Sequence, residues 1–481
     1  MRLRVQTIAL ATFVLIGTIW SAVGHAALDR VKIDAGSVAA GSPVDGINAF
    51  LGIPYAAPPV GELRWRPPQP VKRWNADWNA DHFGTSCMQN QPGSRLPWTE
   101  EFMTQGPIGE DCLYLNVWTG ARNANARQPV MFWIYGGGFN EGSSAVAVYN
   151  GAELAKKGVV FVSANYRVGP LGFFSHPELT RESGRGTSGN YGILDQIAAL
   201  QWVQRNIAAF GGDPGQVTIF GQSAGAISVV DLMRSPLARG LFARAIAQSG
   251  PGLFATTALG RGAALTDRES AGLKFGQAKG AETLAALRAL PAQAFVAPAG
   301  APGGVALPTG PFNDGWVIPA QAPDDQVPLM VGFVADDLGV NGTGPEQKAT
   351  ARERARVAMH LWASDQVKAS KRVYTYYFDR AIPWPEHPEF GAFHSSEIPY
   401  IFRTLDRLKR PWEPIDKKLA DTFSTYVTNF AKKGDPNAAP LPRWPEFDAS
   451  THTTMQLGAR VGTMDLAAPP RVTALIDELR R

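Results

Sequence analysis

Cysteine is scarce in this sequence, which has two, Cys87 and Cys112, among its 481 residues. The sequence also lacks a strong excess of charge of either sign, since 46 Lys and Arg against 42 Asp and Glu leave a formal net charge of +4. The basic residues are scattered rather than clustered, which argues against nucleic acid or an anionic membrane as a partner. No internal repeat is visible. The hydrophobic content of 45% and charged content of 18% are those of an ordinary globular protein.

The N-terminus has the features of an export signal. Arg2 and Arg4 precede an apolar stretch over residues 5–20, and small residues follow at 21–26. We expect cleavage after Ala26, which leaves residues 27–481 as a single domain in the periplasm or outside the cell. A retained membrane anchor is the alternative, but the stretch is shorter than the ~20 residues that span a bilayer, and no Cys follows it for lipid attachment.

Export to an oxidising compartment would allow Cys87 and Cys112 to pair. The resulting disulfide would close a loop of 112 − 87 = 25 positions. On the chain-entropy model, such a loop stabilises a fold by roughly 3 kcal/mol. Two buried free thiols are the alternative.

An apolar, β-favouring run at residues 217–220 leads into Gly221-Gln222-Ser223-Ala224-Gly225, after which small, helix-compatible residues follow. The Gly-x-Ser-x-Gly pattern between a strand and a helix is typical of a nucleophile elbow, where the serine occupies a sharp, strained turn. Gly221 and Gly225 flank it because side chains there would collide with neighbouring backbone. The amide of Ala224, at the start of the helix, can meet a negative oxygen forming beside Ser223.

A second motif, Gly136-Gly137-Gly138, follows an apolar run at residues 130–135. Three glycines after a strand let backbone amides approach a ligand with no side chain between them. With Ala224 they could supply three N–H groups to a tetrahedral intermediate. A flexible turn without a chemical role is the alternative.

Beyond Cys112, predicted strands and helices alternate, which indicates a mostly parallel sheet wrapped in helices. Before it, alternating residues around the turn Asp45-Gly46 predict a small antiparallel β-layer, and the proline-rich residues 52–65 predict fixed irregular structure. One long helix is expected from residue 193 to 210, ended by Gly211 and Pro214. The predicted strands lie at residues 113–118, 130–135, 159–164, 217–222, 243–247, 327–334 and 372–378.

A nucleophilic serine needs a base and an acid, which follow it in this fold in the order Ser, Asp or Glu, His. Among the later histidines, His360 falls in a helical run, His387 lies between prolines, and His452 lies in a polar tail segment. His394 is best placed, in a loop after a strand, where its ring can reach the carboxyl edge of the sheet. The turn after residues 327–334 offers both Asp336 and Asp337 as the acid, and spacing alone does not separate them.

The chain resembles the type B carboxylesterases, the family that includes cholinesterases and bacterial para-nitrobenzyl esterases. The resemblance implies an α/β-hydrolase fold, no cofactor and no metal, with Ser223 as nucleophile and His394 as base. It also implies Gly137, Gly138 and Ala224 as oxyanion donors, a Cys87–Cys112 disulfide and an Arg64–Glu110 ion pair. The motifs that carry it are residues 52–65, 110–117, 135–139, 190–196, 210–214, the elbow and 434–437.

The chain departs from the family pattern at two site positions. The family's Asp-Glu-Gly stands here as Asp336-Asp337-Leu338, which puts the shorter Asp337 at the acid position. Gln222 stands where many relatives have Glu, which removes a negative charge beside the nucleophile and weakens the case for cationic substrates.

The residues and the resemblance together predict hydrolysis of a small-molecule ester through an acyl-enzyme. The same residues would also serve an enzyme of amides, carbamates or lactones. A catalytically silent binding protein is the alternative from another class. It is disfavoured because all three triad positions hold competent residues.

The 394 − 337 = 57 positions between acid and base are fewer than in many relatives that the chain resembles. This interval offers one clear helix, at residues 352–363, so we expect a shortened cap over a wide, shallow pocket. Residues 297–304 are rich in Pro, Gly and Ala and predict either a mobile rim loop or an inert surface loop.

Overall fold

The computed structural model describes residues 28–91, 93–250, 263–296, 307–320, 326–338, 344–369 and 372–480. The expected export signal, residues 1–26, and the expected rim loop, residues 297–304, lie outside these ranges. Within them, none of the helices combines the length and the apolar composition needed to cross a membrane.

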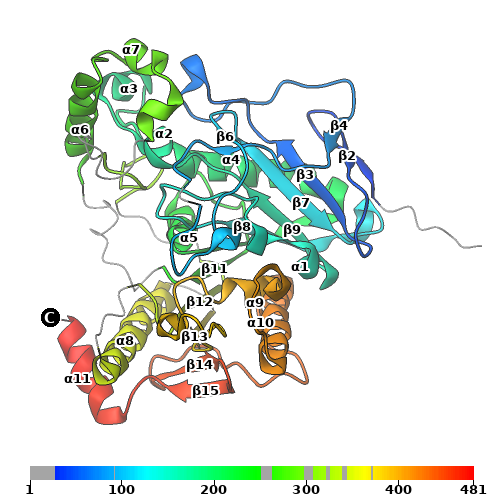
Figure 1. Ribbon diagram of the computed structural model, residues 1–481, viewed down its shortest axis with the longest axis vertical. Helices are drawn as coiled ribbons and strands as arrows, with labels where there is room; N and C mark the ends of the chain where they lie inside the picture. The colour runs from blue at the N-terminus through cyan, green and yellow to red at the C-terminus, as the bar shows by residue number, and fades with distance from the viewer. Residues whose placement is uncertain are drawn as a thin grey trace, which may run out of the picture.

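A ten-stranded sheet runs through the described part of the chain, in the order β15-β14-β13-β12-β11-β10-β8-β9-β7-β3 (Figure 1). Neighbouring strands are parallel from β9 to β14, and antiparallel pairs close both ends. The predicted mostly parallel sheet is therefore confirmed. Its strands are β3 (Asn48–Pro54), β7 (Tyr114–Thr119), β8 (Gln128–Ile134), β9 (Val160–Ala164), β10 (Gly212–Gln222), β11 (Arg244–Gln248), β12 (Leu329–Val334), β13 (Val373–Phe378), β14 (Thr453–Leu457) and β15 (Val461–Asp465).

Helices cover both faces of this sheet, and α8 and α10 lie on opposite sides of β12 and β13 (Figure 1). The α-helices are α1 (Ala152–Lys156), α2 (Gly169–Phe173), α3 (Pro177–Glu182), α4 (Tyr191–Asn206), α5 (Ala224–Arg234), α6 (Leu265–Ala278), α7 (Leu284–Ala289), α8 (Pro345–Ala369), α9 (Ile398–Phe402), α10 (Pro414–Lys433) and α11 (Pro469–Arg480). Short 3₁₀ helices are η1 (Gly61–Leu63), η2 (Glu100–Phe102), η3 (Ala124–Ala126), η4 (Ala147–Tyr149), η5 (Ile207–Phe210), η6 (Ala292–Phe295), η7 (Pro388–Phe390) and η8 (Leu405–Arg407).

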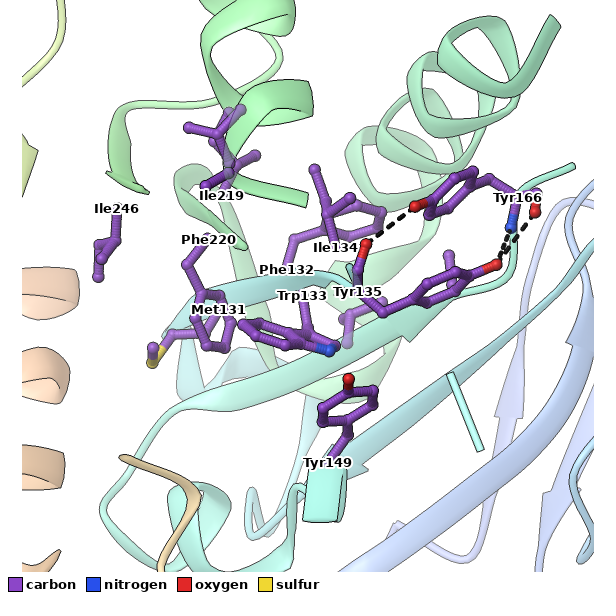
Figure 2. Close-up of a cluster of buried hydrophobic side chains, with 14 of the residues drawn as sticks. Met131, Phe132, Trp133, Ile134, Tyr135, Tyr149, Tyr166, Ile219, Phe220 and Ile246 are labelled. Atoms are coloured by element: carbon purple, nitrogen blue, oxygen red, sulfur yellow. Dashed lines mark hydrogen bonds between the residues drawn. The ribbon is translucent and has the colours of Figure 1, made fainter. Parts of the chain in front are cut away.

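Strands β8 and β10 pair at the centre of the sheet, covered on both faces, which explains their near-continuous apolar sequences. Trp133 of β8 packs with ring centroids 4.8 Å from Phe220 of β10 and 4.9 Å from Phe402 of α9. Just beyond β8, Tyr135 and Tyr166 stack at 4.3 Å and are joined by three hydrogen bonds (Figure 2). These contacts fix the course of the chain as it leaves β8 toward the glycine motif.

The N-terminal β-layer differs in two respects from the prediction. Strand β1 (Arg30–Lys32) pairs antiparallel with β2 (Ser37–Ala40), but β2 pairs parallel with β4 (Trp78–Ala80). The turn at Asp45-Gly46 forms as expected, with φ values of 49° and 76°, yet the strand after it, β3, joins the central sheet. Burial decides this, because Phe50 of β3 is fully buried and packs 4.9 Å from Phe210.

The predicted long helix at residues 193–210 is observed as α4 followed by the 3₁₀ helix η5. It ends at Gly211, whose φ of 79° is the left-handed conformation that a helix C-terminus favours. The helix expected at residues 352–363 is longer, since α8 has 25 residues, and it packs against β13 and α11.

Candidate active site

Ser223 occupies the turn between β10 and α5, with φ 59° and ψ −124°, a conformation that is strained for a residue with a side chain. The flanking glycines are required by close packing. A Cβ on Gly225 would lie 2.0 Å from the carbonyl oxygen of Ile134, and one on Gly221 would lie 2.6 Å from the backbone of Gly225. The strand, turn and helix therefore have the elbow geometry that the sequence predicts.

The glycine motif after β8 lies directly against this elbow. A Cβ on Gly136 would be 2.9 Å from the Cβ of Ser223. Gly137 and Gly138 have φ values of 106° and 63°, which only glycine adopts freely. Ala224 is the first residue of α5, so its amide belongs to the N-terminal N–H groups that have no acceptor within the helix. The glycine motif and the first residue of α5 thus both adjoin Ser223, through Gly136 in space and through Ala224 in the chain.

His394 and Asp337 form a buried pair, with 2.5 Å between Nδ1 of the imidazole and Oδ1 of the carboxylate. Asp337 follows β12, and its carboxylate also accepts hydrogen bonds from the amides of Val334 and Leu338, at 3.2 and 2.8 Å. These donors hold the carboxylate in place, so it can orient the imidazole.

The structure separates the two acid candidates. Asp336 points away from His394: it pairs with Arg352 and accepts a hydrogen bond of 2.9 Å from the amide of Ala392. Of the two, Asp337 contacts the histidine.

The other candidate histidines have different surroundings. His360 packs 5.0 Å from the ring of Phe447 and 5.3 Å from that of His452, and burial lowers its pKa to about 4. His387 contacts the Glu389 carboxylate at 3.0 Å.

Gln222 makes a contact that sequence reasoning missed. Its Nε2 lies 3.1 Å from Nε2 of His394, the ring nitrogen opposite the one that faces Asp337. An amide nitrogen only donates, so this contact suits the tautomer with the proton on Nδ1, which donates to Asp337. Because Gln222 directly precedes Ser223, the contact also places the imidazole beside the elbow.

Glu397, three residues after His394 in the sequence, is a second acidic residue near the site. The side chain is fully buried, and neither carboxyl oxygen has a hydrogen-bond partner among the described residues. Burial, and then the nearby Asp337 carboxylate, raise its pKa to about 8. At neutral pH the Glu397 carboxyl therefore favours its protonated, uncharged form.

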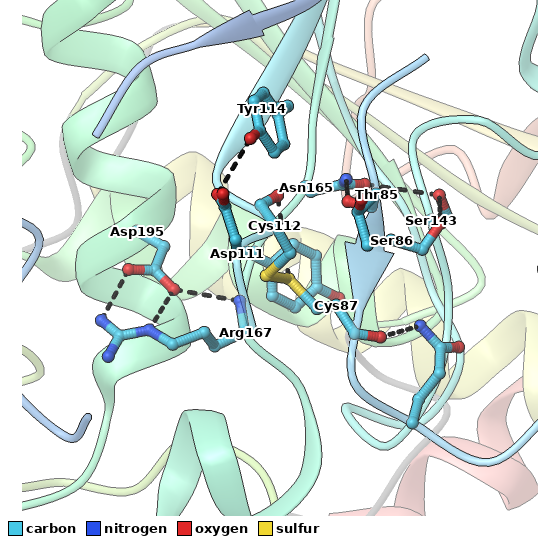
Figure 3. Close-up of a disulfide and its surroundings, with 12 residues drawn as sticks. Thr85, Ser86, Cys87, Asp111, Cys112, Tyr114, Ser143, Asn165, Arg167 and Asp195 are labelled. Atoms are coloured by element: carbon cyan, nitrogen blue, oxygen red, sulfur yellow. Dashed lines mark hydrogen bonds and ion pairs between the residues drawn. A yellow bond between two sulfur atoms is a disulfide. The ribbon is translucent and has the colours of Figure 1, made fainter. Parts of the chain in front are cut away.

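Cys87 and Cys112 form the predicted disulfide, which closes a segment that we call the disulfide loop, residues 88–111 (Figure 3). At the end of the loop, Arg64 and Glu110 form the predicted ion pair, with two contacts of 2.6 Å. Both predictions are confirmed. Within the described residues, no group of three or more His, Cys, Asp and Glu side chains is arranged to bind a metal ion.

A serine elbow, a glycine loop against it and a histidine–carboxylate pair, at one edge of a mostly parallel sheet, define a serine hydrolase of the α/β-hydrolase fold. The model of the carboxylesterase family matches residues 30–357 and 348–470, and this chain belongs to that family. It is a carboxylic ester hydrolase, and the resemblance seen in the sequence is confirmed.

Two curated relatives cover most of the chain. The fumonisin B1 esterase of Sphingopyxis macrogoltabida is 35% identical over 87% of this chain and 84% of that protein. The para-nitrobenzyl esterase of Bacillus subtilis (strain 168) is 32% identical over 88% of this chain and 93% of that protein. A solved structure of PNB esterase superimposes with a TM-score of 0.76 at 29% identity, covering 93% of this chain and 99% of that one.

Proposed function

We propose that this protein is an exported esterase that hydrolyses carboxylic esters through an acyl-enzyme, with Ser223, His394 and Asp337 as its catalytic triad. The observation that carries the proposal is the placement of His394, whose two ring nitrogens face Asp337 at 2.5 Å and Gln222, the neighbour of Ser223, at 3.1 Å. Such a placement lets one imidazole nitrogen act on the serine while the other is oriented by a carboxylate.

In the acylation step, His394 accepts the hydroxyl proton of Ser223 as the serine oxygen attacks the ester carbonyl. The amides of Gly137, Gly138 and Ala224 donate to the oxyanion of the tetrahedral intermediate, each worth about 3 kcal/mol of barrier by comparison with measured deletions. His394 then returns the proton to the departing alcohol. A water molecule repeats the sequence and releases the carboxylic acid.

The test of this assignment is covalent labelling with an organophosphate, followed by mass spectrometry. The adduct should lie on Ser223, and Ser223→Ala should lose both the adduct and about 10⁶ in kcat. Ser183→Ala, at an exposed serine, is the matched control and should behave as wild type. An adduct on another residue, or an active Ser223→Ala enzyme, would overturn the assignment.

A substrate with bulky groups is the second part of the proposal. The described segment between Asp337 and His394 has α8 as its α-helix, and α8 packs against β13 and α11. A thin cover would enclose little of a long acyl chain. Because each Å² of buried apolar surface contributes only ~25 cal/mol to binding, a longer chain would then gain little affinity. The names of the two relatives support an ester as substrate.

We therefore expect kcat/KM to change little from acetyl to long-chain p-nitrophenyl esters, and bulky aromatic esters to be accepted. A steep rise of kcat/KM with acyl length would contradict an open site.

Export is the third part, and it rests on the basic and apolar pattern of residues 1–26 together with a disulfide in the mature domain. N-terminal sequencing of protein recovered from the periplasm or the medium should begin at Ala27. An uncleaved chain in the cytoplasm would contradict it.

A further inference from the structure

Trp98, a residue of the disulfide loop, contacts His394. Its indole Nε1–H donates a hydrogen bond of 3.0 Å to the carbonyl oxygen of His394, 296 positions away in the sequence. The indole and imidazole rings are also edge to face, with centroids 6.3 Å apart and planes at 85°. Trp98 thus touches both the backbone and the ring of the histidine.

The accepting carbonyl belongs to a peptide group that needs support. Ser395, the next residue, has φ 83°, which is strained for a residue other than glycine. On the N-terminal side of His394, two hydrogen bonds of 2.9 Å hold the backbone. The amide of Asp336 donates to the carbonyl oxygen of Ala392, and the amide of Ala392 donates to the carboxylate of Asp336. The contact with Trp98 holds the remaining side, so both ends of the histidine backbone are tied.

Trp98 is itself tied to the glycine motif. Two backbone hydrogen bonds of 2.8 Å join it to Arg95, whose guanidinium lies 5.5 Å from the indole centroid. Arg95 forms an ion pair of 2.5 Å with Glu141, and the amide of Glu141 donates to the carbonyl of Gly137. A continuous set of contacts therefore runs from the histidine, through the disulfide loop, to the predicted oxyanion donors.

Gln89 adds a second tie at the other end of the same loop. Its amide side chain donates to the carbonyl of Gly142 at 2.8 Å and accepts from the amide of Gly142 at 2.7 Å. Gln89 and Arg95 thus tie two separate points of the loop to the residues around the glycine motif, and Arg95 is the one that lies next to Trp98.

We propose that Trp98 is a positioning residue of this esterase: its indole N–H sets the orientation of the His394–Ser395 peptide and keeps the imidazole in register with Ser223 and the glycine motif. The inference rests on the triad proposed above. Trp98→Phe keeps an aromatic ring but removes the donor, and a small displacement of a catalytic group can cost up to 10²-fold in rate. We expect kcat to fall about tenfold, with KM for p-nitrophenyl acetate unchanged within about twofold.

The matched control is Trp78→Phe. Trp78, in β4 of the N-terminal β-layer, is also half-buried, and its Nε1–H donates a hydrogen bond of 3.0 Å to the carbonyl oxygen of Gly52 in β3. Each variant loses one indole hydrogen bond to a carbonyl, so both should lower Tm by a similar amount, about 1 °C. The rate constant for organophosphate labelling of Ser223 should fall with kcat in Trp98→Phe and remain at the wild-type value in Trp78→Phe.

Equal kcat in the two variants overturns the proposal, because Trp98 is then structural only. A raised KM with unchanged kcat also overturns it, since Trp98 then binds substrate. If Trp98→Phe does not fold, Arg95→Met is the second variant, because Arg95 is exposed and supports the position of Trp98. A two- to fivefold fall in kcat at constant KM supports the proposal, and wild-type kcat refutes it. Failure of the triad itself is distinguishable, because wild-type enzyme would then lack the label on Ser223.

Discussion

Replacement of Glu397 by Gln is the perturbation whose effect follows most directly from the structure. The carboxyl is fully buried, neither oxygen has a partner among the described residues, and its pKa is raised from 4.5 to about 8 by burial and by Asp337. Glutamine has nearly the shape of the protonated acid but cannot ionise. The substitution therefore removes a titration while preserving packing.

The sign of the pH dependence follows from proton linkage. Below pH 4.5 the carboxyl is protonated in the folded and unfolded states alike, so it does not change the free energy of unfolding with pH. Between pH 4.5 and 8 the unfolded chain loses the proton and the folded chain keeps it, so the wild type loses about 1.4 kcal/mol of stability per pH unit. From pH 4.5 to 7 the loss is about 3 kcal/mol, and the Gln variant avoids it.

The assay is thermal unfolding of both proteins between pH 4.5 and 8. For a chain of this length, about 3 kcal/mol corresponds to roughly 3 °C in Tm. The Tm of Glu397→Gln should therefore rise relative to wild type by that amount as the pH increases from 4.5 to 7. Glu282→Gln, at an exposed carboxylate, should show no such trend. A difference that stays constant with pH would mean that Glu397 is ionised in the folded protein and would refute the reasoning.

Two further predictions concern the acid and the disulfide. Asp337→Asn should reduce kcat by about 10⁴ because it favours the wrong imidazole tautomer, whereas Asp336→Asn should cost far less; steady-state kinetics would show the reverse ranking if Asp336 were the acid. Replacing both Cys87 and Cys112 by Ser should lower the free energy of unfolding by about 3 kcal/mol, because the bridge spans 25 positions. Urea denaturation measures this, and a change below about 1 kcal/mol would contradict the chain-entropy argument.

Much of the fold could be predicted from the sequence because its elements are locally encoded. The central strands are continuous apolar runs, and each is observed within a few residues of its predicted position, apart from β10, which begins earlier, at Gly212. The N-terminal layer was harder to predict, because β1 to β4 are short and their pairing depends on which apolar face the rest of the sheet buries. The packing of Phe50 against Phe210 places β3 in the central sheet, and the residues next to Phe50 in the sequence do not predict that contact.

The sequence by itself determined the elbow and the glycine motif, because both depend on residues adjacent in the chain and on the absence of side chains at Gly221, Gly225 and Gly136. It did not separate Asp336 from Asp337 by spacing, since neighbours on a turn point in different directions and only the packed loops decide which one meets His394.

The contacts of Gln222 and Trp98 with His394 join residues 172 and 296 positions apart. The raised pKa of Glu397 depends on its burial and on the nearby Asp337 carboxylate. Such properties arise only when the chain is folded, because they depend on distances in space and on the exclusion of water, neither of which a linear pattern contains.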